Sequence, residues 1–274
     1  MDASLQDYIE ELYDSGRPMS WGTLALCAVL FYRPDMKGRL GLAARALKGW
    51  RRLSPALSKP PMSRDVARVV AMKLARGGRA SMGVAVLVAH HCYLRVSEYC
   101  GLWRSDVAMA GEPGTGLDAI MALRLRSTKT GKNQHVTVSD PLVAAVLTAL
   151  IQREDARRSF RSHGRDYELF DFTTREFRIA FLRTLVTLDM GHLGFNTHSL
   201  RHGGATHDYL AGRSIESVLL RGRWASTKSA RIYIQEGRAR LIATKIPQRW
   251  LEWSKEMASA YGWVFLHLIR EEST

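Results

Sequence analysis

Three residue types near the end of the chain could act together on a phosphate group. His198 and Arg201 stand three residues apart in His198-Ser-Leu-Arg201-His202, and Tyr233 follows further along in Ser229-Ala-Arg-Ile-Tyr233. On a helix, residues three apart share a face, so the imidazole and the guanidinium could converge on one anion. Arginine offers a planar fork for two phosphate oxygens, and imidazole can move a proton near neutral pH. A tyrosine close to such a site could attack phosphorus.

Attack on a phosphodiester without a metal ion needs fixed cations, a proton acceptor for the nucleophile and a proton donor for the leaving oxygen. A tyrosine hydroxyl with a pKa near 10 is only about 0.1% ionised at pH 7, so it needs such help. The sequence has no clustered carboxylates and no Cys/His set beyond His90-His91-Cys92, which more simply caps or lines a helix. We therefore expect no metal ion and no other cofactor.

Further candidates for these roles lie upstream. Arg95 stands in an otherwise apolar stretch, where a buried charge is costly without a partner, and Glu98 follows one helical turn later. A structural ion pair between the two explains them equally well. Lys129 falls in an expected turn, where a lysine is usually solvated and where Lys132 competes for any role. Trp224 alone is most simply a core residue, so none of these signals is specific when taken by itself.

The elements expected to position these residues are helices and one hairpin, which makes the fold class mainly α with a small β-hairpin sheet (α+β). Met82–Glu98 is predicted to be one nearly all-apolar helix that carries Arg95 and is buried on most sides. Apolar and polar residues alternate through Ala119–Val138 on either side of Thr130-Gly131-Lys132-Asn133. This alternation around a turn predicts a β-hairpin.

More helices are predicted in the second half of the chain. Asp140-Pro141 supplies a cap and a first-turn proline for a helix through Ile151, and Thr173-x-x-Glu176 is a capping box. A short helix is expected around residues 200–210. Gly203-Gly204 weakens that helix, and close backbone packing is the only reason that we can offer for the pair.

Proline-rich punctuation divides the chain. Ser54-Pro55 and Lys59-Pro60-Pro61 predict a stiff linker. We expect a helical domain over residues 1–58 and a second domain over residues 62–240. A C-terminal helical tail over 241–274 is too rich in tryptophan to be left in water, and docking on the chain's own core or on a neighbouring protomer are both open.

The net charge of +14, with an isoelectric point near 10.1, indicates a polyanionic partner. No acidic residue occurs between Met36 and Arg64. A merely solvated basic surface is the plainer alternative, but so long a stretch without acids favours contact with a polyanion. The residues expected to bind a nucleic-acid backbone are Lys37, Arg39, Arg45, Lys48, Arg51, Arg52 and Lys132.

The order of the candidate residues resembles the tyrosine recombinase (phage integrase) family over roughly residues 62–240. The resemblance implies that residues 62–240 form a catalytic domain and that residues 1–58 form a reduced DNA-clamping domain. The type IB topoisomerases have similar residue types, but their histidine follows the second arginine instead of preceding it by three, so the recombinases are the better match. The matching stretches are Leu94-Arg95-Val-Ser-Glu98, the lysine-bearing hairpin, His198-Ser-Leu-Arg201-His202-Gly-Gly-Ala-Thr206, Gly222-Arg-Trp224 and Tyr233.

The resemblance implies how the phosphate would be held and how protons would move. Arg95 and Arg201 would clamp the scissile phosphate and stabilise its pentavalent transition state. His198 would assist deprotonation of the nucleophile. Lys129 would protonate the leaving 5′ oxygen.

The resemblance also implies the covalent step and its support. Tyr233 would attack, leaving a 3′-phosphotyrosyl link and a free 5′ hydroxyl. Trp224 would donate a hydrogen bond from its indole N–H. Glu98 and His202 would orient the groups that touch the phosphate.

Taken together, these features lead us to expect a metal- and ATP-independent recombinase or integrase of a mobile element. It would act on double-stranded DNA as a homotetramer on synapsed sites, with no small-molecule substrate. A catalytically silent DNA-binding protein of recombinase ancestry and a topoisomerase-like DNA relaxer are the alternatives. The sequence contains no run of about 18 apolar residues, the length expected of a membrane-spanning helix. The acidic N-terminus and three apolar-flanked cysteines favour an intracellular, DNA-associated protein, in a nucleoid or a nucleus.

Overall fold

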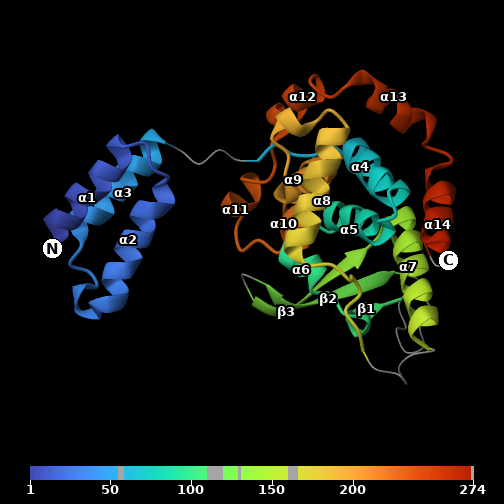
Figure 1. The fold of residues 1–274 in the computed structure, drawn as a ribbon, viewed down its shortest axis with the longest axis horizontal. Helices are drawn as coiled ribbons and strands as arrows, with labels where there is room; N and C mark the ends of the chain where they lie inside the picture. Colours follow the sequence, from blue (N-terminus) through green and yellow to red (C-terminus); the bar gives the residue numbers. More distant parts are fainter. Residues whose placement is uncertain (55–58, 110–119, 129–130, 160–165, 273–274) are drawn as a thin grey trace. The chain divides into compact units, whose positions relative to one another are not determined.

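The structure is a computed structural model, and it divides into two compact units, Met1–Ser58 and Lys59–Thr274. Each unit has a hydrophobic core of its own. The architecture is mainly helical with one small antiparallel sheet, as the sequence predicts (Figure 1). No helix in the described part of the chain is both long and apolar enough to cross a membrane. The structure describes residues 1–54, 59–109, 120–128, 131–159 and 166–272.

The first unit consists of three helices, α1 (Asp2–Asp14), α2 (Met19–Tyr32) and α3 (Gly41–Leu53). The start of α3 is fixed from α1, because the Asp2 carboxylate accepts from two backbone N–H groups of its first turn, at 2.9 and 3.0 Å. The core of this unit is small, and several large apolar residues of α2 stay exposed. The buried residues are Leu5, Ile9, Leu12, Leu40, Ala43, Leu47 and Trp50.

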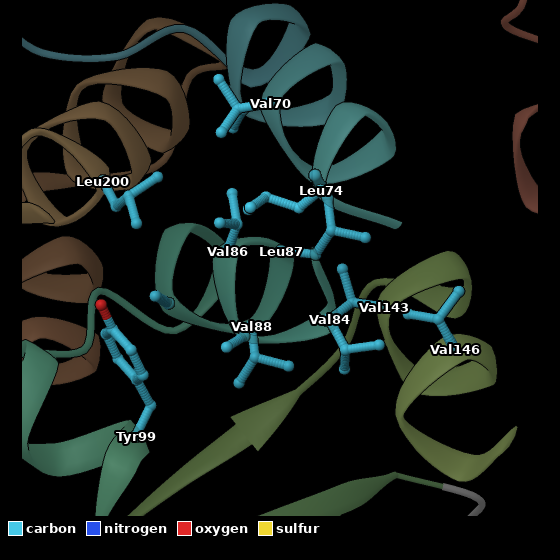
Figure 2. Close-up of a cluster of buried hydrophobic side chains, with 14 of the residues drawn as sticks. Val70, Leu74, Val84, Val86, Leu87, Val88, Tyr99, Val143, Val146 and Leu200 are labelled. Carbon is cyan, nitrogen blue, oxygen red and sulfur yellow. The ribbon is translucent and has the colours of Figure 1, made fainter. Parts of the chain in front are cut away.

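The second unit is built around a central pair of helices, α4 (Arg64–Arg76) and α5 (Ala80–His91). Helix α5 is apolar on nearly all sides, and its side chains are buried on nearly all sides as well. Figure 2 shows the valines and leucines of these two helices packed against residues of the helices around them. This core holds the elements of the candidate site in fixed positions.

The sheet lies against this helical core and has the strand order β1-β2-β3. β1 (Val107–Ala108), β2 (Met121–Thr128) and β3 (Gly131–Val138) are antiparallel, and Leu123 pairs with Val136. One face is buried because apolar residues recur at every second position. The predicted hairpin is therefore confirmed. The position predicted for its turn, Thr130-Gly131-Lys132-Asn133, is wrong, because Gly131, Lys132 and Asn133 belong to β3 and the ladder continues to the Thr128–Gly131 pair.

The prediction of one continuous helix over Met82–Glu98 is wrong. Helix α5 ends at His91, and a separate short helix, α6, spans Val96–Cys100. Tyr93 takes the left-handed conformation (φ 49°), and the Leu94 N–H donates to the Ala89 carbonyl at 3.0 Å. This is the hydrogen bond of a helix-ending turn in which the left-handed position usually belongs to glycine. The residues carried no glycine to signal the break.

The remaining helices follow the predicted capping signals where these exist. Asp140 caps α7 (Pro141–Ser159), which runs past the predicted end at Ile151. The Thr173–Glu176 capping box opens α8, because each residue bonds the other's backbone N–H. The other bounds are α8 (Thr174–Thr187), α9 (Thr197–Leu210), α10 (Ile215–Gly222), α11 (Thr227–Arg231), α12 (Glu236–Ala243), α13 (Gln248–Glu256) and α14 (Tyr261–Glu271), with 3₁₀ turns at Pro34–Met36, Arg104–Asp106 and Gly191–Leu193.

The tail packs on its own unit. Phe265 and Ile269 of α14 are fully buried in the core with α7, α4 and α5. The Trp250 indole N–H donates to the Leu188 carbonyl at 2.8 Å, and the Tyr261 hydroxyl donates to the Arg68 carbonyl at 2.9 Å. Of the two possibilities left open by the sequence, the described contacts of α13 and α14 support docking on the chain's own core.

Candidate functional site

Helix α9 brings three of the predicted residues to one place. Its start is set by Asn196, whose side-chain oxygen accepts from the His198 N–H at 2.9 Å. His198 lies exposed in the first turn, whereas Arg201 and His202 are buried. His198 and Arg201 are one turn apart, as their spacing predicts.

The glycine pair after this motif allows α9 to lie close to two other backbones. A Cβ atom on Gly203 would lie 1.8 Å from the Met62 carbonyl oxygen, and one on Gly204 would lie 1.9 Å from the His90 carbonyl oxygen. No side chain fits at either position. The close backbone packing expected from the sequence thus explains the pair.

Arg201 is a fully buried cation at the centre of the site. Its Nη1 donates to the Tyr93 carbonyl, and its Nη2 donates to the Gly222 carbonyl at 2.7 Å. The guanidinium carbon lies 4.8 Å from the centroid of the Trp224 ring and 5.1 Å from that of Tyr233. Burial first, and then the charges of Arg95 and Arg223, lower the pKa of Arg201 to about 10. It still carries its charge at neutral pH.

A buried carboxylate joins two further arginines beside Arg201. Glu98 accepts from the Arg95 Nη1 at 2.6 Å, from the Arg95 backbone N–H at 2.8 Å and from Arg223 Nη2 at 2.8 Å. The Glu98 side chain is 1% exposed, and that of Arg95 is 16% exposed. Two arginines thus share one carboxylate while Arg201 lies beside them, which leaves a local excess of positive charge.

Arg95 does not occupy the helical position expected from the sequence. It stands at the residue before α6, in an extended conformation (φ −80°, ψ 154°). From there its backbone N–H reaches Glu98, three residues into the helix, and so fixes the carboxylate that Arg223 also uses. The Arg95–Glu98 pair is therefore both structural and part of the arginine cluster.

The nucleophile candidate Tyr233 lies in a stack of aromatic rings over Arg201. Its ring centroid is 4.7 Å from that of Trp224 and 4.6 Å from that of His202. Two backbone hydrogen bonds hold its segment, since Tyr233 N–H donates to Ala230 O and Tyr233 O accepts from the Thr206 hydroxyl. These contacts bring the residue to the arginine cluster from the end of α11.

His202 supports this stack and is neutral. Its Nδ1 lies 3.0 Å from the Gln235 side-chain amide. Burial lowers the pKa of His202 to about 4, although a hydrogen bond to the Tyr233 backbone opposes the shift. For His198, desolvation first and then the charge of Arg201 lower the pKa. Both imidazoles are therefore uncharged at pH 7, and His198 is free to accept a proton.

Three N–H groups in the cluster are buried without a hydrogen-bond acceptor among the described residues. They are Nε of Arg201, Nε of Arg223 and the indole Nε1 of Trp224. Leaving a buried donor unpaired costs about 1–3 kcal/mol, so native structures rarely do it without cause. Donors of this kind gathered around excess positive charge suit an anion with several acceptor oxygens.

Solved structures share this fold, although no protein-family model and no curated protein matches the chain. A lambda integrase dimer bound to a COC′ core site superposes with a TM-score of 0.57 at 13% identity, covering 86% of this chain and 65% of that one. The Tn1549 transposon integrase, in complex with circular intermediate DNA, gives 0.57 at 13% over 88% and 84%. XerH recombinase bound to difH gives 0.51 at 16% over 77% and 66%. The chain has the tyrosine recombinase fold.

Within this recombinase fold, the structure brings five of the six predicted catalytic residues together. Lys129 lies outside the described residues. Lys132 is exposed on β3, opposite Ser127 of β2. The basic residues predicted to bind DNA from the first unit are all exposed: Lys37, Arg39, Arg45, Lys48, Arg51 and Arg52.

Sequence reasoning missed two members of the site. Arg223 was inside a matched stretch, Gly222-Arg-Trp224, but its partner Glu98 is far away in the sequence. Tyr93, next to the Leu94-Arg95 stretch, supplies the carbonyl that accepts from Arg201. Their positions beside matched residues were the only available signals. Among the described residues, no group of three or more His, Cys, Asp or Glu side chains is placed to hold a metal ion.

Proposed function

We propose that the chain is a site-specific DNA recombinase that cleaves and rejoins strands through a 3′-phosphotyrosyl intermediate. The observation that carries this proposal is the gathering of Arg95, Arg201 and Tyr233 around buried, unpaired N–H donors. The Tyr233 ring centroid lies 5.1 Å from the guanidinium carbon of Arg201, so the candidate nucleophile is next to the buried cation. The proposal also rests on the recombinase fold and on the order of the matched stretches.

In the proposed reaction, the Tyr233 oxygen attacks phosphorus and its proton passes to the neutral imidazole of His198. The bond from phosphorus to the 5′ oxygen breaks, and Lys129 returns a proton to that oxygen, with Lys132 as the alternative donor. Arg95 and Arg201 stabilise the charge that grows on the non-bridging oxygens. Because the covalent link keeps the energy of the broken bond, a second 5′ hydroxyl reverses the step without ATP.

The guanidinium of Arg201 is covered by neighbouring groups, which limits how a phosphate can reach it. Two of its five N–H groups are bonded to carbonyls, and the rings of Trp224 and Tyr233 cover the guanidinium. A phosphate therefore contacts Arg201 only after one of these rings moves. Arg95, whose side chain is partly exposed, would meet the phosphate first.

Double-stranded DNA is the proposed substrate. The chain carries a net charge of +14, and the exposed basic residues of the first unit suit a DNA backbone. The three similar recombinases are described as DNA complexes, which supports the same partner here. We propose that residues 1–58 clamp DNA, that 62–240 cut it and that a homotetramer forms on synapsed sites of a mobile element.

Salt dependence tests the DNA assignment by itself. Each neutralised phosphate contributes about −0.9 to the slope of log K against log salt. The six exposed basic residues of the first unit predict that log K falls with log salt with a slope of several units, as measured by a filter-binding or fluorescence titration. A nearly flat dependence would contradict DNA as the partner.

The burial of Arg201 favours one alternative function, a DNA-binding protein that does not cleave DNA. Nicked duplexes tiled over the DNA that flanks the gene separate the two functions, with covalent adducts detected by denaturing electrophoresis in the presence of EDTA. The proposal predicts an adduct with the natural chain and with Tyr209→Phe, an exposed tyrosine of α9, but none with Tyr233→Phe. Salt-sensitive binding with no adduct supports the alternative. An adduct formed by Tyr233→Phe contradicts the assigned nucleophile.

A further inference from the structure

Tyr93 occupies a backbone conformation that a tyrosine seldom adopts. It sits at the end of α5 with φ 49°, in the left-handed position that glycine usually fills. A bulky residue there is strained, and such strain persists only when the surroundings hold it. The contacts of this side chain therefore need an explanation.

The side chain of Tyr93 is fully buried and is held on three sides. Its hydroxyl donates to Asp208 of α9 at 2.5 Å. Its ring is stacked on that of Trp224, with centroids 6.1 Å apart and planes inclined by 23°. The guanidinium carbon of Arg221 lies 5.5 Å from the ring centroid. One residue thus ties the end of α5 to α9 and α10.

The backbone of Tyr93 serves the candidate site directly. Its carbonyl accepts from Nη1 of Arg201, and Arg95 follows two residues later. The direction of that carbonyl and the path of the chain into Arg95 both depend on the left-handed turn. Anything that fixes the Tyr93 side chain therefore fixes two of the arginines.

The acceptor Asp208 is itself fixed. It pairs with Arg213 at 3.3 Å and lies 3.7 Å from Arg221, whose Nε donates to the His91 carbonyl. Burial and the hydrogen bond to Asp208 raise the pKa of Tyr93. The hydroxyl therefore stays a donor to the carboxylate throughout the working pH range.

We propose that Tyr93 is a positioning residue, whose hydrogen bond to Asp208 holds the left-handed turn that orients Arg95 and Arg201 for phosphate binding. The proposal rests on the proposed recombinase function, because orientation of the arginines matters only if they act on a phosphate. Tyr93 touches no substrate in this account. It acts through the arginines and through the Trp224 ring.

The test compares two tyrosines, each of which donates a hydrogen bond from its hydroxyl to an aspartate. Tyr93→Phe removes one hydroxyl bonded to Asp208, and Tyr167→Phe removes one bonded to Asp155 at 2.6 Å, away from the arginine cluster. Both changes should lower the melting temperature by similar amounts. Only Tyr93→Phe should slow adduct formation at saturating DNA, by about tenfold to a hundredfold, since small displacements of positioning groups have effects of that size. In both variants the affinity for DNA should stay within about twofold of the affinity of the natural chain.

A second variant and a second measurement separate this proposal from the function on which it rests. The double variant Tyr93→Phe/Asp208→Asn should react no more slowly than Asp208→Asn alone, because Asp208→Asn already removes the carboxylate that accepts from Tyr93 and pairs with Arg213 and Arg221. Amide hydrogen exchange over residues 92–100, measured without DNA, should speed up in Tyr93→Phe and not in Tyr167→Phe. Unchanged exchange over 92–100, or equal adduct rates for Tyr93→Phe and Tyr167→Phe, overturns the positioning role. If the natural chain forms no adduct, the recombinase function fails and the exchange result still decides whether Tyr93 holds the turn.

Discussion

Glu98→Gln is the substitution whose effect the arginine cluster predicts most sharply. The carboxylate is the anion shared by Arg95 and Arg223, through three hydrogen bonds of 2.6 to 2.8 Å. Its side chain is 1% exposed, so water cannot replace it. Glutamine has nearly the same shape but no charge, which leaves two guanidinium groups, and Arg201 beside them, without a counter-ion.

The expected loss of stability follows from the burial. Removing one partner of a buried ion pair costs about 3–5 kcal/mol, because the remaining charge stays buried. Glutamine keeps one oxygen that can still accept, so we expect a value near the lower end, about 3 kcal/mol. For a unit of this size each kcal/mol lowers the melting temperature by roughly 2–4 °C, which gives a drop of about 6–12 °C.

Thermal unfolding followed by circular dichroism measures this drop, with Glu236→Gln as the matched control. Glu236 pairs with Arg240 in an exposed i, i+4 bridge at 3.0 Å, which is worth at most about 0.5 kcal/mol. Added sulfate should stabilise Glu98→Gln more than the natural chain, since the anion can bind beside the partly exposed Arg95 side chain and offset the uncompensated positive charge. If Glu98→Gln and Glu236→Gln melt within about 2 °C of each other, the carboxylate is not holding the cluster as described.

Two further predictions concern the second unit. Burial lowers the pKa of His90 to about 3 and the pKa values of His91 and His202 to about 4, below the unfolded value of 6.5. As the pH falls below 6.5, these histidines therefore become protonated in the unfolded chain but stay neutral in the folded chain. Each of them lowers the free energy of unfolding by about 1.4 kcal/mol per pH unit, down to its folded pKa. Melting temperatures should fall steadily from pH 6.5 to 5, and a flat profile in this range contradicts the burial of neutral imidazoles. Gly203→Ala should destabilise the fold by about 3 kcal/mol or more, because its Cβ would lie 1.8 Å from a carbonyl oxygen. Gly237→Ala on α12 has open space around the new Cβ and should stabilise the fold by about 0.5–1 kcal/mol. Chemical denaturation of both variants checks the opposite signs, and equal stabilities for the two would refute the close packing of α9.

Local signals in the sequence predicted local structure well. The Thr173–Glu176 box and the Asp140-Pro141 cap marked helix starts, because each depends on neighbouring residues only. The alternation of apolar and polar residues marked the strands of the hairpin but misplaced its turn, because Gly131 begins β3. The break at Tyr93 could not be predicted in this way. A left-handed tyrosine has no local signal, and it is held by Asp208 and Arg221 from distant helices.

The candidate site was predictable where residue order carried it and not where distant pairing did. His198, Arg201 and Tyr233 were identified from spacing and from resemblance, and the structure places them around one cluster of charge. The part played by Arg223 depends on an ion pair with Glu98 that only the folded chain creates. The direction of Arg201, towards two carbonyls under two aromatic rings, likewise follows from tertiary packing.

The central claim is that Tyr233 becomes covalently linked to DNA, and peptide mapping of the adduct tests it most directly. Trypsin should release residues 232–238, Ile-Tyr-Ile-Gln-Glu-Gly-Arg, in which Tyr233 is the only hydroxyl-bearing residue. After nuclease digestion of trapped adduct, mass spectrometry should find a nucleotide attached to this peptide through a 3′ phosphate, with a free 5′ hydroxyl on the other DNA end. A nucleotide on any other peptide, or a 5′-linked nucleotide on this one, would contradict the account.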